Sequence, residues 1–226
     1  LDNHVISLTG LNAGTYNLTV TTIPDEDHYS VILNATITVN PIQTQLIANE
    51  VTAIYNVNKY LTITLKDANG NPISGVSMTV VLNGAKTYVT DANGQVKVST
   101  KAIAPKKYSA KVTFNGNANY LKSSKTIKVT VKKATPKLAA NKKTFKKSVK
   151  VKKYTITLKH GKAPLKKVKV YVKIKGKTYK ATTNSKGKAI FKIKKLTRKG
   201  TFKSKIIFKG NKYYNKVTKK VKIKVK

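Results

Sequence analysis

The sequence has no cysteine and no tryptophan, and its single arginine is Arg198. Without cysteine there can be no disulfide bond, no thiolate nucleophile and no thiolate metal site. No apolar run approaches the roughly 18 residues that a membrane helix needs, so we expect no transmembrane segment. Acidic residues are scarce, and none follows Asp91. Hydrolase triads and paired catalytic carboxylates are therefore excluded from residues 134–226.

What the chain has in abundance is lysine: 47 of its 226 residues are Lys or Arg against seven Asp or Glu, a formal net charge of +40. The charge is graded along the chain, with −4 in residues 1–40, +10 in residues 41–133 and +34 in residues 134–226. Like charges at this density repel one another and destabilise a compact domain. A polyanionic partner would supply the countercharge. The alternative is that lysine serves only as a solubilising residue on exposed strands and reflects the base composition of the gene.

The sequence repeats itself with a period of about 93 residues. "YLTITLKD" (60–67) aligns with "KYTITLKH" (153–160), and "YSAKVTFNGNANYLK" (108–122) aligns with "FKSKIIFKGNKYYNK" (202–216). "GTYNLTVTTIPDEDHYS" (14–30) matches the same late region of the repeat. We therefore predict the C-terminal part of a truncated repeat at 1–40, a complete repeat at 41–133 and a complete, lysine-rich repeat at 134–226. We expect the chain to be a piece of a longer protein.

Within a repeat the hydrophobic period is two. From 168 to 175 every even position is Val or Ile and every odd position is Lys or Tyr. Such alternation is typical of half-buried β-strands, and turn sequences such as "DANG" (91–94) and "NSKG" (184–187) separate the runs. No helical period competes with this pattern. The sequence predicts an all-β fold of tandem immunoglobulin-like β-sandwich domains, each of about seven antiparallel strands.

Three stretches resemble a known family: "GLNAGTYNLTVT" (10–21), "LKDANGNPISGVSMTVVLNG" (65–84) and "KVTFNGNANY" (111–120). They are similar to the Ig-like repeats of prokaryotic surface adhesins, above all the adhesin-like proteins of methanogenic archaea, which are related in style to invasin and intimin repeats. The resemblance implies an extracellular stalk at the cell surface or cell wall, with no catalytic residue and no cofactor. Some such domains form a Lys–Asn isopeptide bond assisted by a buried carboxylate, for which Glu50 is the candidate here.

The outward face of one sheet changes character along the chain. Strands C, F and G share a sheet in an Ig-like sandwich, and their outward positions are rich in Asn and Thr in the first repeat and in lysine in the third. We predict that the lysines on this face of the third repeat bind a polyanion. They are Lys169, Lys173, Lys203, Lys205, Lys222 and Lys224.

The predicted partner is an anionic cell-wall polymer or envelope, while domains upstream of this chain would contact surface glycans or a partner cell. Two alternatives stay open: a purely structural spacer that presents an upstream binding domain, and a non-specific binder of nucleic acid or acidic polysaccharide. Sequence-specific recognition of nucleic acid is not expected. It relies on Arg, Asn, Gln and stacked aromatics, whereas lysine is a point charge suited to diffuse attraction.

Two triplets, "NLT" at Asn17 and "NAT" at Asn34, fit the acceptor pattern for N-glycosylation. Strand alternation places both asparagines on the outward face of the first repeat. We therefore predict glycosylation at Asn17 and Asn34.

The acidic stretch "PDEDHY" (24–29) raises the question of a metal site. Alignment of Tyr29 with Tyr120 makes it the loop between strands F and G, lengthened by one residue. Asp25, Glu26 and Asp27 are the candidate ligands for calcium, which prefers hard oxygens. Calcium takes about six to eight oxygens, however, and this loop supplies only one cluster. The expectation is therefore no metal site.

Overall fold

The computed structural model describes residue 6 and residues 8–226, and every regular element in this part is a β-strand. No helix in the described residues has the length and apolar character to cross a membrane. The chain divides into two compact units with interleaved bounds, one of Leu1–Val51, Tyr60–Ser99 and Lys107–Val129, the other of Thr52–Lys59, Thr100–Lys106 and Thr130–Lys226. The hydrogen-bonded sheets each stay within residues 14–39, 44–132 or 137–225. The predicted boundaries at residues 40 and 133 remain predictions.

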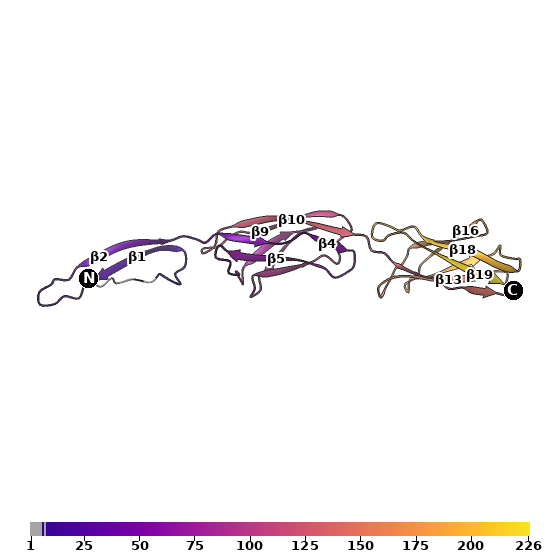
Figure 1. Cartoon of the computed structure of the whole chain (residues 1–226), viewed down its shortest axis with the longest axis horizontal. Coiled ribbons are helices and arrows are strands. Elements are labelled where there is room, and N and C mark those ends of the chain that lie inside the picture. Colours follow the sequence, from indigo (N-terminus) through magenta and orange to yellow (C-terminus); the bar gives the residue numbers. More distant parts are fainter. Residues whose placement is uncertain (1–5, 7) are drawn as a thin grey trace. The chain divides into compact units, whose positions relative to one another are not determined.

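Residues 14–39 form an antiparallel hairpin of β1 (Gly14–Thr21) and β2 (Ile32–Val39) (Figure 1). The apolar side chains Tyr16 and Leu18 lie on one face of the hairpin and are half-buried. The Tyr16 hydroxyl donates a hydrogen bond to the carbonyl oxygen of Asn12 (2.7 Å). This bond back to the preceding backbone is the tyrosine corner that marks strand F of Ig-like sandwiches.

Residues 44–132 form two sheets. The smaller has the strand order β3 (Thr44–Ile47), β5 (Tyr60–Asp67), β8 (Gln95–Ser99). The larger has the order β4 (Val51–Ile54), β10 (Ser123–Lys132), β9 (Lys107–Phe114), β6 (Ser77–Val81), β7 (Ala85–Val89). Fully buried side chains of both sheets, among them Leu61, Ile63, Val112 and Val129, make the core.

Residues 137–225 repeat this plan (Figure 1). One sheet contains β11 (Lys137–Ala139), β13 (Lys152–His160), β14 (Ala163–Pro164) and β17 (Lys188–Ile193). The other has the order β12 (Lys143–Phe145), β19 (Val217–Val225), β18 (Gly200–Phe208), β15 (Lys169–Ile174), β16 (Lys177–Thr182). The apolar positions of the alternation, such as Val170, Phe191 and Ile223, are fully buried. The two sheets packed around one core confirm the predicted Ig-like sandwich class.

The first strand of each complete repeat departs from the simple seven-strand prediction. The chain leaves the first sheet after β11 and joins the second as β12, so one strand becomes two. β11 pairs antiparallel with β13, whereas β12 pairs parallel with β19. The sheets are therefore not purely antiparallel. β11 and β12 are each three residues long. Alternation cannot be recognised over so few residues, so the sequence did not predict them as separate strands.

The structure also corrects the alignment of the acidic loop. The amide of Asp25 donates to the carbonyl oxygen of His28 (3.2 Å), as the amide of Asn117 donates to that of Tyr120 (2.9 Å). His28 therefore occupies the place of Tyr120, and the prediction that Tyr29 does so is wrong. Tyr29 is 94% exposed. The predicted extra residue is absent as well: Thr22 bonds to Val31 as Phe208 pairs with Val217, and eight residues separate the partners in both hairpins.

Candidate polyanion-binding surface

Three neighbouring strands carry two rows of lysines on their outward face. Strand register places Lys173 of β15 opposite Lys205 of β18, and Lys205 opposite Lys220 of β19. In the next row Lys203 lies opposite Lys222. All five are exposed. Neighbouring backbones are about 5 Å apart across strands and about 7 Å apart between alternate residues along a strand. The face is therefore a closely spaced lattice of cations.

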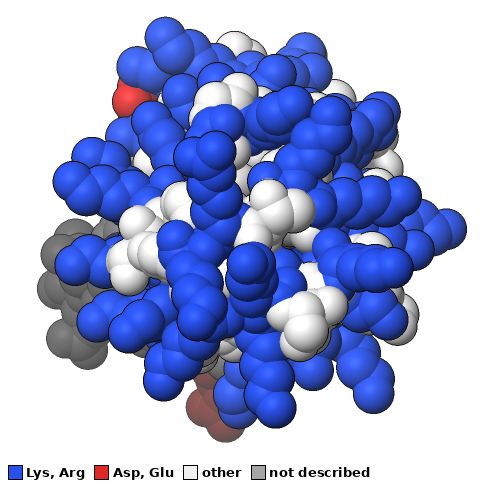
Figure 2. Space-filling model, turned by 90° about the vertical axis from the view of Figure 1, so that its right-hand side faces the viewer, with Lys and Arg blue, Asp and Glu red and all other residues white. Residues whose placement is uncertain are grey.

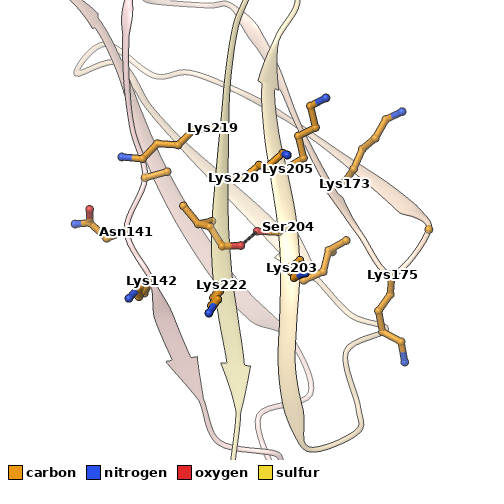
Figure 3. Close-up of a pocket in the computed structure, with 14 residues that line it drawn as sticks. Asn141, Lys142, Lys173, Lys175, Lys203, Ser204, Lys205, Lys219, Lys220 and Lys222 are labelled. Carbon is orange, nitrogen blue, oxygen red and sulfur yellow. Dashed lines mark hydrogen bonds between the residues drawn. The ribbon is translucent and has the colours of Figure 1, made fainter.

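This lattice lines a groove of about 850 Å³ (Figure 3). Asn141 and Lys142, from the crossover between β11 and β12, lie at one side, and Lys175, which follows β15, lies at the other. With Lys219, eight lysines line the groove, and none of the lining residues is acidic. We call it the lysine groove.

The lysine groove overlaps the predicted site in part. Of the six predicted lysines, Lys173, Lys203, Lys205 and Lys222 line the groove. Lys169 and Lys224 are exposed but do not line it.

Sequence reasoning missed four lining lysines: Lys142, Lys175, Lys219 and Lys220. Lys220 follows the same alternation as Lys222 and could have been found. Lys142 reaches the groove only because β12 pairs with β19, which is distant in the sequence. Lys175 ends the alternation of residues 168–175 and could also have been found, although its φ of 47° places it in the turn after β15. Lys219 falls at an inward position of the alternation yet is exposed. Alternation alone could not indicate Lys142 or Lys219.

Lysines cover most of the face at the C-terminal end of the chain (Figure 2). The ion pairs His28–Asp25 and Lys128–Glu50 contain no residue of 134–226, and that segment has no acidic side chain of its own with which its lysines could pair. Crowding has a direct electrostatic effect at Lys177. The Lys195 side chain lowers the pKa of Lys177, through a hydrogen bond and through repulsion between the two ammonium groups.

Glu50 does not fit the role of a buried carboxylate. Its side chain is 67% exposed, and Oε2 of its carboxylate lies 3.4 Å from Lys128 Nζ. An isopeptide-forming site needs a carboxylate shielded from water, so the isopeptide hypothesis for Glu50 is wrong.

Asn17 and Asn34 lie on the same face of the β1–β2 hairpin and are exposed. Asn17 is opposite Thr36 and Asn34 is opposite Thr19, so each asparagine faces the threonine of the other triplet. The Thr19 hydroxyl donates to Asn34 Oδ1 (2.8 Å). Both acceptor triplets are thus accessible on one surface, and glycosylation of either stays a prediction.

The carboxylate of Asp25 is already engaged within its own turn. Asp25 Oδ1 is 2.7 Å from His28 Nδ1 and accepts a hydrogen bond from the amide of Asp27 (3.0 Å). The bond to His28, followed by that to Asp27, lowers the pKa of Asp25. Within the described part of the chain no group of three or more His, Cys, Asp or Glu could hold a metal ion. The calcium alternative at Asp25, Glu26 and Asp27 therefore gains no support from this geometry.

No family model and no curated protein matches the chain. Similar solved structures include invasin, a bacterial integrin-binding protein (TM-score 0.48, 18% identity, 81% of this chain and 39% of that chain). A bacterial ice-binding adhesin has a TM-score of 0.37 and 14% identity over 94% of this chain and 74% of the other. The titin domains Z1Z2 in complex with telethonin have a TM-score of 0.40 and 10% identity over 81% and 96%. These values are too low to assign a function.

Proposed function

We propose that this chain is part of a non-enzymatic cell-surface adhesin or stalk, of the archaeal adhesin-like type that its sequence resembles. Its lysine-coated residues 134–226 bind an anionic cell envelope electrostatically. The observation that carries the proposal is the lysine groove within a segment of net charge +34 that has no acidic residue.

Lysine suits this role physically. An exposed ammonium is a compact charge on a flexible stem, which attracts anions of many shapes without fixed geometry. Binding of this kind releases counterions from the polyanion, so its affinity falls steeply as salt rises. The weakly acidic residues 1–40, with their two glycosylation triplets, would face away from the envelope.

The test is sedimentation of the full chain with isolated cell walls at several salt concentrations. We expect binding at low salt and release as salt rises. Replacing the four predicted lysines of the groove by Gln should weaken binding more than replacing four exposed loop lysines, because the charges in the groove are close together. The groove set is Lys173, Lys203, Lys205 and Lys222, and the loop set is Lys147, Lys150, Lys162 and Lys166.

Other outcomes would contradict the proposal. Binding that ignores salt, or no binding, would rule out electrostatic retention. Wall binding unaffected by either set of substitutions would favour a structural spacer. Equal displacement by any soluble polyanion, nucleic acid included, would favour a non-specific binder.

A further inference from the structure

The two complete repeats differ at one pair of facing positions. In the second repeat Glu50, on the crossover between β3 and β4, forms an ion pair with Lys128 of β10 (3.4 Å). "LIANE" (46–50) corresponds to "LAANK" (138–142), so Lys142 takes the place of Glu50. Lys222 of β19 takes the place of Lys128. An internal ion pair has become a pair of cations.

Strand register brings this pair together. Lys143 is paired with Ile223, so the preceding residues Lys142 and Lys222 are neighbours across β12 and β19. Both line the lysine groove (Figure 3). Two neighbouring ammonium groups repel each other, whereas an anion between them would be attracted by both. The place that a carboxylate fills in one repeat is thus open to an external anion in the other.

The remaining groove positions changed in the same direction. Only Lys205 and Lys219 correspond to lysines of the second repeat, Lys111 and Lys125. Four others replace neutral residues, Lys173 for Val81, Lys175 for Asn83, Lys203 for Ser109 and Lys220 for Thr126. The scaffold is the same, while the groove has exchanged one acid and four neutral side chains for cations.

The lysines also form a line that leads away from the Lys142–Lys222 pair. Lys222 is opposite Lys203, and Lys175 follows Ile174, which pairs with the residue after Lys203. The line therefore crosses the sheet from Lys142 to Lys175 in steps of about 5 Å between backbones. This spacing is comparable with the length of one sugar unit.

We propose that the lysine groove binds a linear carboxylated polysaccharide of the uronate type, with one carboxylate held between Lys142 and Lys222. This inference rests on the proposed polyanion-binding function and names its ligand class. The ligand carboxylate takes the place that Glu50 fills beside Lys128. Carboxylates of the following sugar units meet Lys203 and Lys175. A carboxylate, rather than a phosphate, is favoured because the same scaffold already holds one at this place.

The test uses the full chain and fluorescently labelled hexagalacturonate. The substitution Lys142→Glu restores the internal carboxylate beside Lys222 and so competes with the ligand. Lys169→Glu is the matched control, because it makes the same change of charge at an exposed position of β15 outside the groove. We expect Lys142→Glu to weaken binding at least tenfold more than Lys169→Glu, with Lys142→Gln in between. Should Lys142→Glu fail to fold, Lys142→Gln against Lys169→Gln gives the same comparison.

The outcomes separate this inference from the proposed function. If Lys142→Glu and Lys169→Glu weaken binding equally while the unmodified chain still binds walls, the proposed carboxylate site in the groove is wrong. Electrostatic binding of the envelope by residues 134–226 would then still stand. Tighter binding of inorganic polyphosphate than of hexagalacturonate overturns the carboxylate assignment. If the chain binds neither hexagalacturonate nor walls, both proposals are wrong.

Discussion

Asp67, at the end of β5, shows how one buried carboxylate can hold a turn. It is 8% exposed. Its Oδ1 accepts hydrogen bonds from the amides of Asn69 (2.9 Å) and Asn71 (2.8 Å), and its Oδ2 accepts one from Asn71 Nδ2 (3.1 Å). Burial raises the pKa of Asp67, but the bonds from Asn71 and Asn69 outweigh burial, so the pKa lies below its ordinary value of 3.8. The charged form of Asp67 therefore stabilises the fold.

We expect Asp67→Ala to lower the free energy of unfolding of residues 41–133 by about 1–3 kcal/mol, because three hydrogen bonds to a charged acceptor are lost. Asp67→Asn keeps an acceptor oxygen and should be less damaging. Since the folded-state pKa is depressed, the stabilisation by charge is present above pH 3.8 and is lost as pH falls through the lower, folded-state pKa. Urea unfolding at pH 7 and pH 2.5 measures both effects. An unchanged difference between the protein and Asp67→Asn at the two pH values would contradict this account.

The reach of sequence reasoning is visible at single residues. Alternation predicted that Lys203 and Lys205 point outward and that Val170 is buried, because a strand has only two faces. It said nothing of Lys142, whose position beside Lys222 depends on a pairing between segments about 80 residues apart in the sequence. Long-range pairing leaves no local signal, so part of the lysine groove could be found only in three dimensions.

At the scale of elements, the turn that precedes β17 is fixed by a close backbone approach. Gly187 has a φ of +70°, and a Cβ there would lie 2.5 Å from the carbonyl oxygen of Leu158. The Gly187 carbonyl in turn accepts a hydrogen bond from the amide of Leu158 (2.9 Å). Gly176, in the turn after β15, has a similar φ of +68° but no neighbour within 4 Å of such a Cβ. A side chain at Gly176 would suffer backbone strain alone, whereas one at Gly187 would suffer both strain and a steric clash. Comparing the two positions therefore distinguishes the two effects.

We expect Gly187→Ala to lower the free energy of unfolding by about 3 kcal/mol or more, because it combines left-handed strain with a clash against backbone. Gly176→Ala should lower it by only about 1–2 kcal/mol, because strain alone applies. Thermal or urea unfolding followed by circular dichroism measures both changes. Equal losses for the two variants would contradict the steric role of Gly187.

The sequence predicted the turn that contains Gly187, since "NSKG" lies between alternating strands, and made no prediction for the turn that contains Gly176. It could not rank them, because the difference lies in whether another strand passes close by. The same limit explains β11 and β12. Each strand is too short to show alternation. β11 forms by pairing with β13 and β12 by pairing with β19, and neither pairing leaves a local signal in the sequence.

At the scale of the whole molecule, the charge gradient acts on stability as well as on binding. Residues 134–226 carry a net charge of +34 without a single acidic side chain, so their compact state is opposed by self-repulsion. Residues 41–133 carry +10 and include the Lys128–Glu50 pair. Dissolved salt screens repulsion between exposed charges over about 10 Å at 0.1 M.

Raising the salt concentration from about 10 mM to about 300 mM should therefore stabilise residues 134–226 more than residues 41–133. We expect the melting temperature of the third repeat to rise by several degrees, since a change of about 1 kcal/mol shifts the melting temperature of such a domain by roughly 4–8 °C. Hydrogen exchange of the full chain, resolved by segment, measures this difference. Equal gains in both segments would show that self-repulsion does not limit the stability of the third repeat.

The absence of carboxylates after Asp91 has a consequence for the behaviour of the complex in acid. Residues 134–226 contain no Asp or Glu side chain and a single histidine, His160. The protein surface thus keeps nearly constant charge while its partner titrates. A uronate polymer loses its charge at about pH 4 or below, as carboxylates do, whereas a phosphodiester polymer stays charged. The pH at which the chain detaches from an envelope is therefore a property of the envelope, and the third repeat serves as a fixed-charge reporter of which acid the envelope contains.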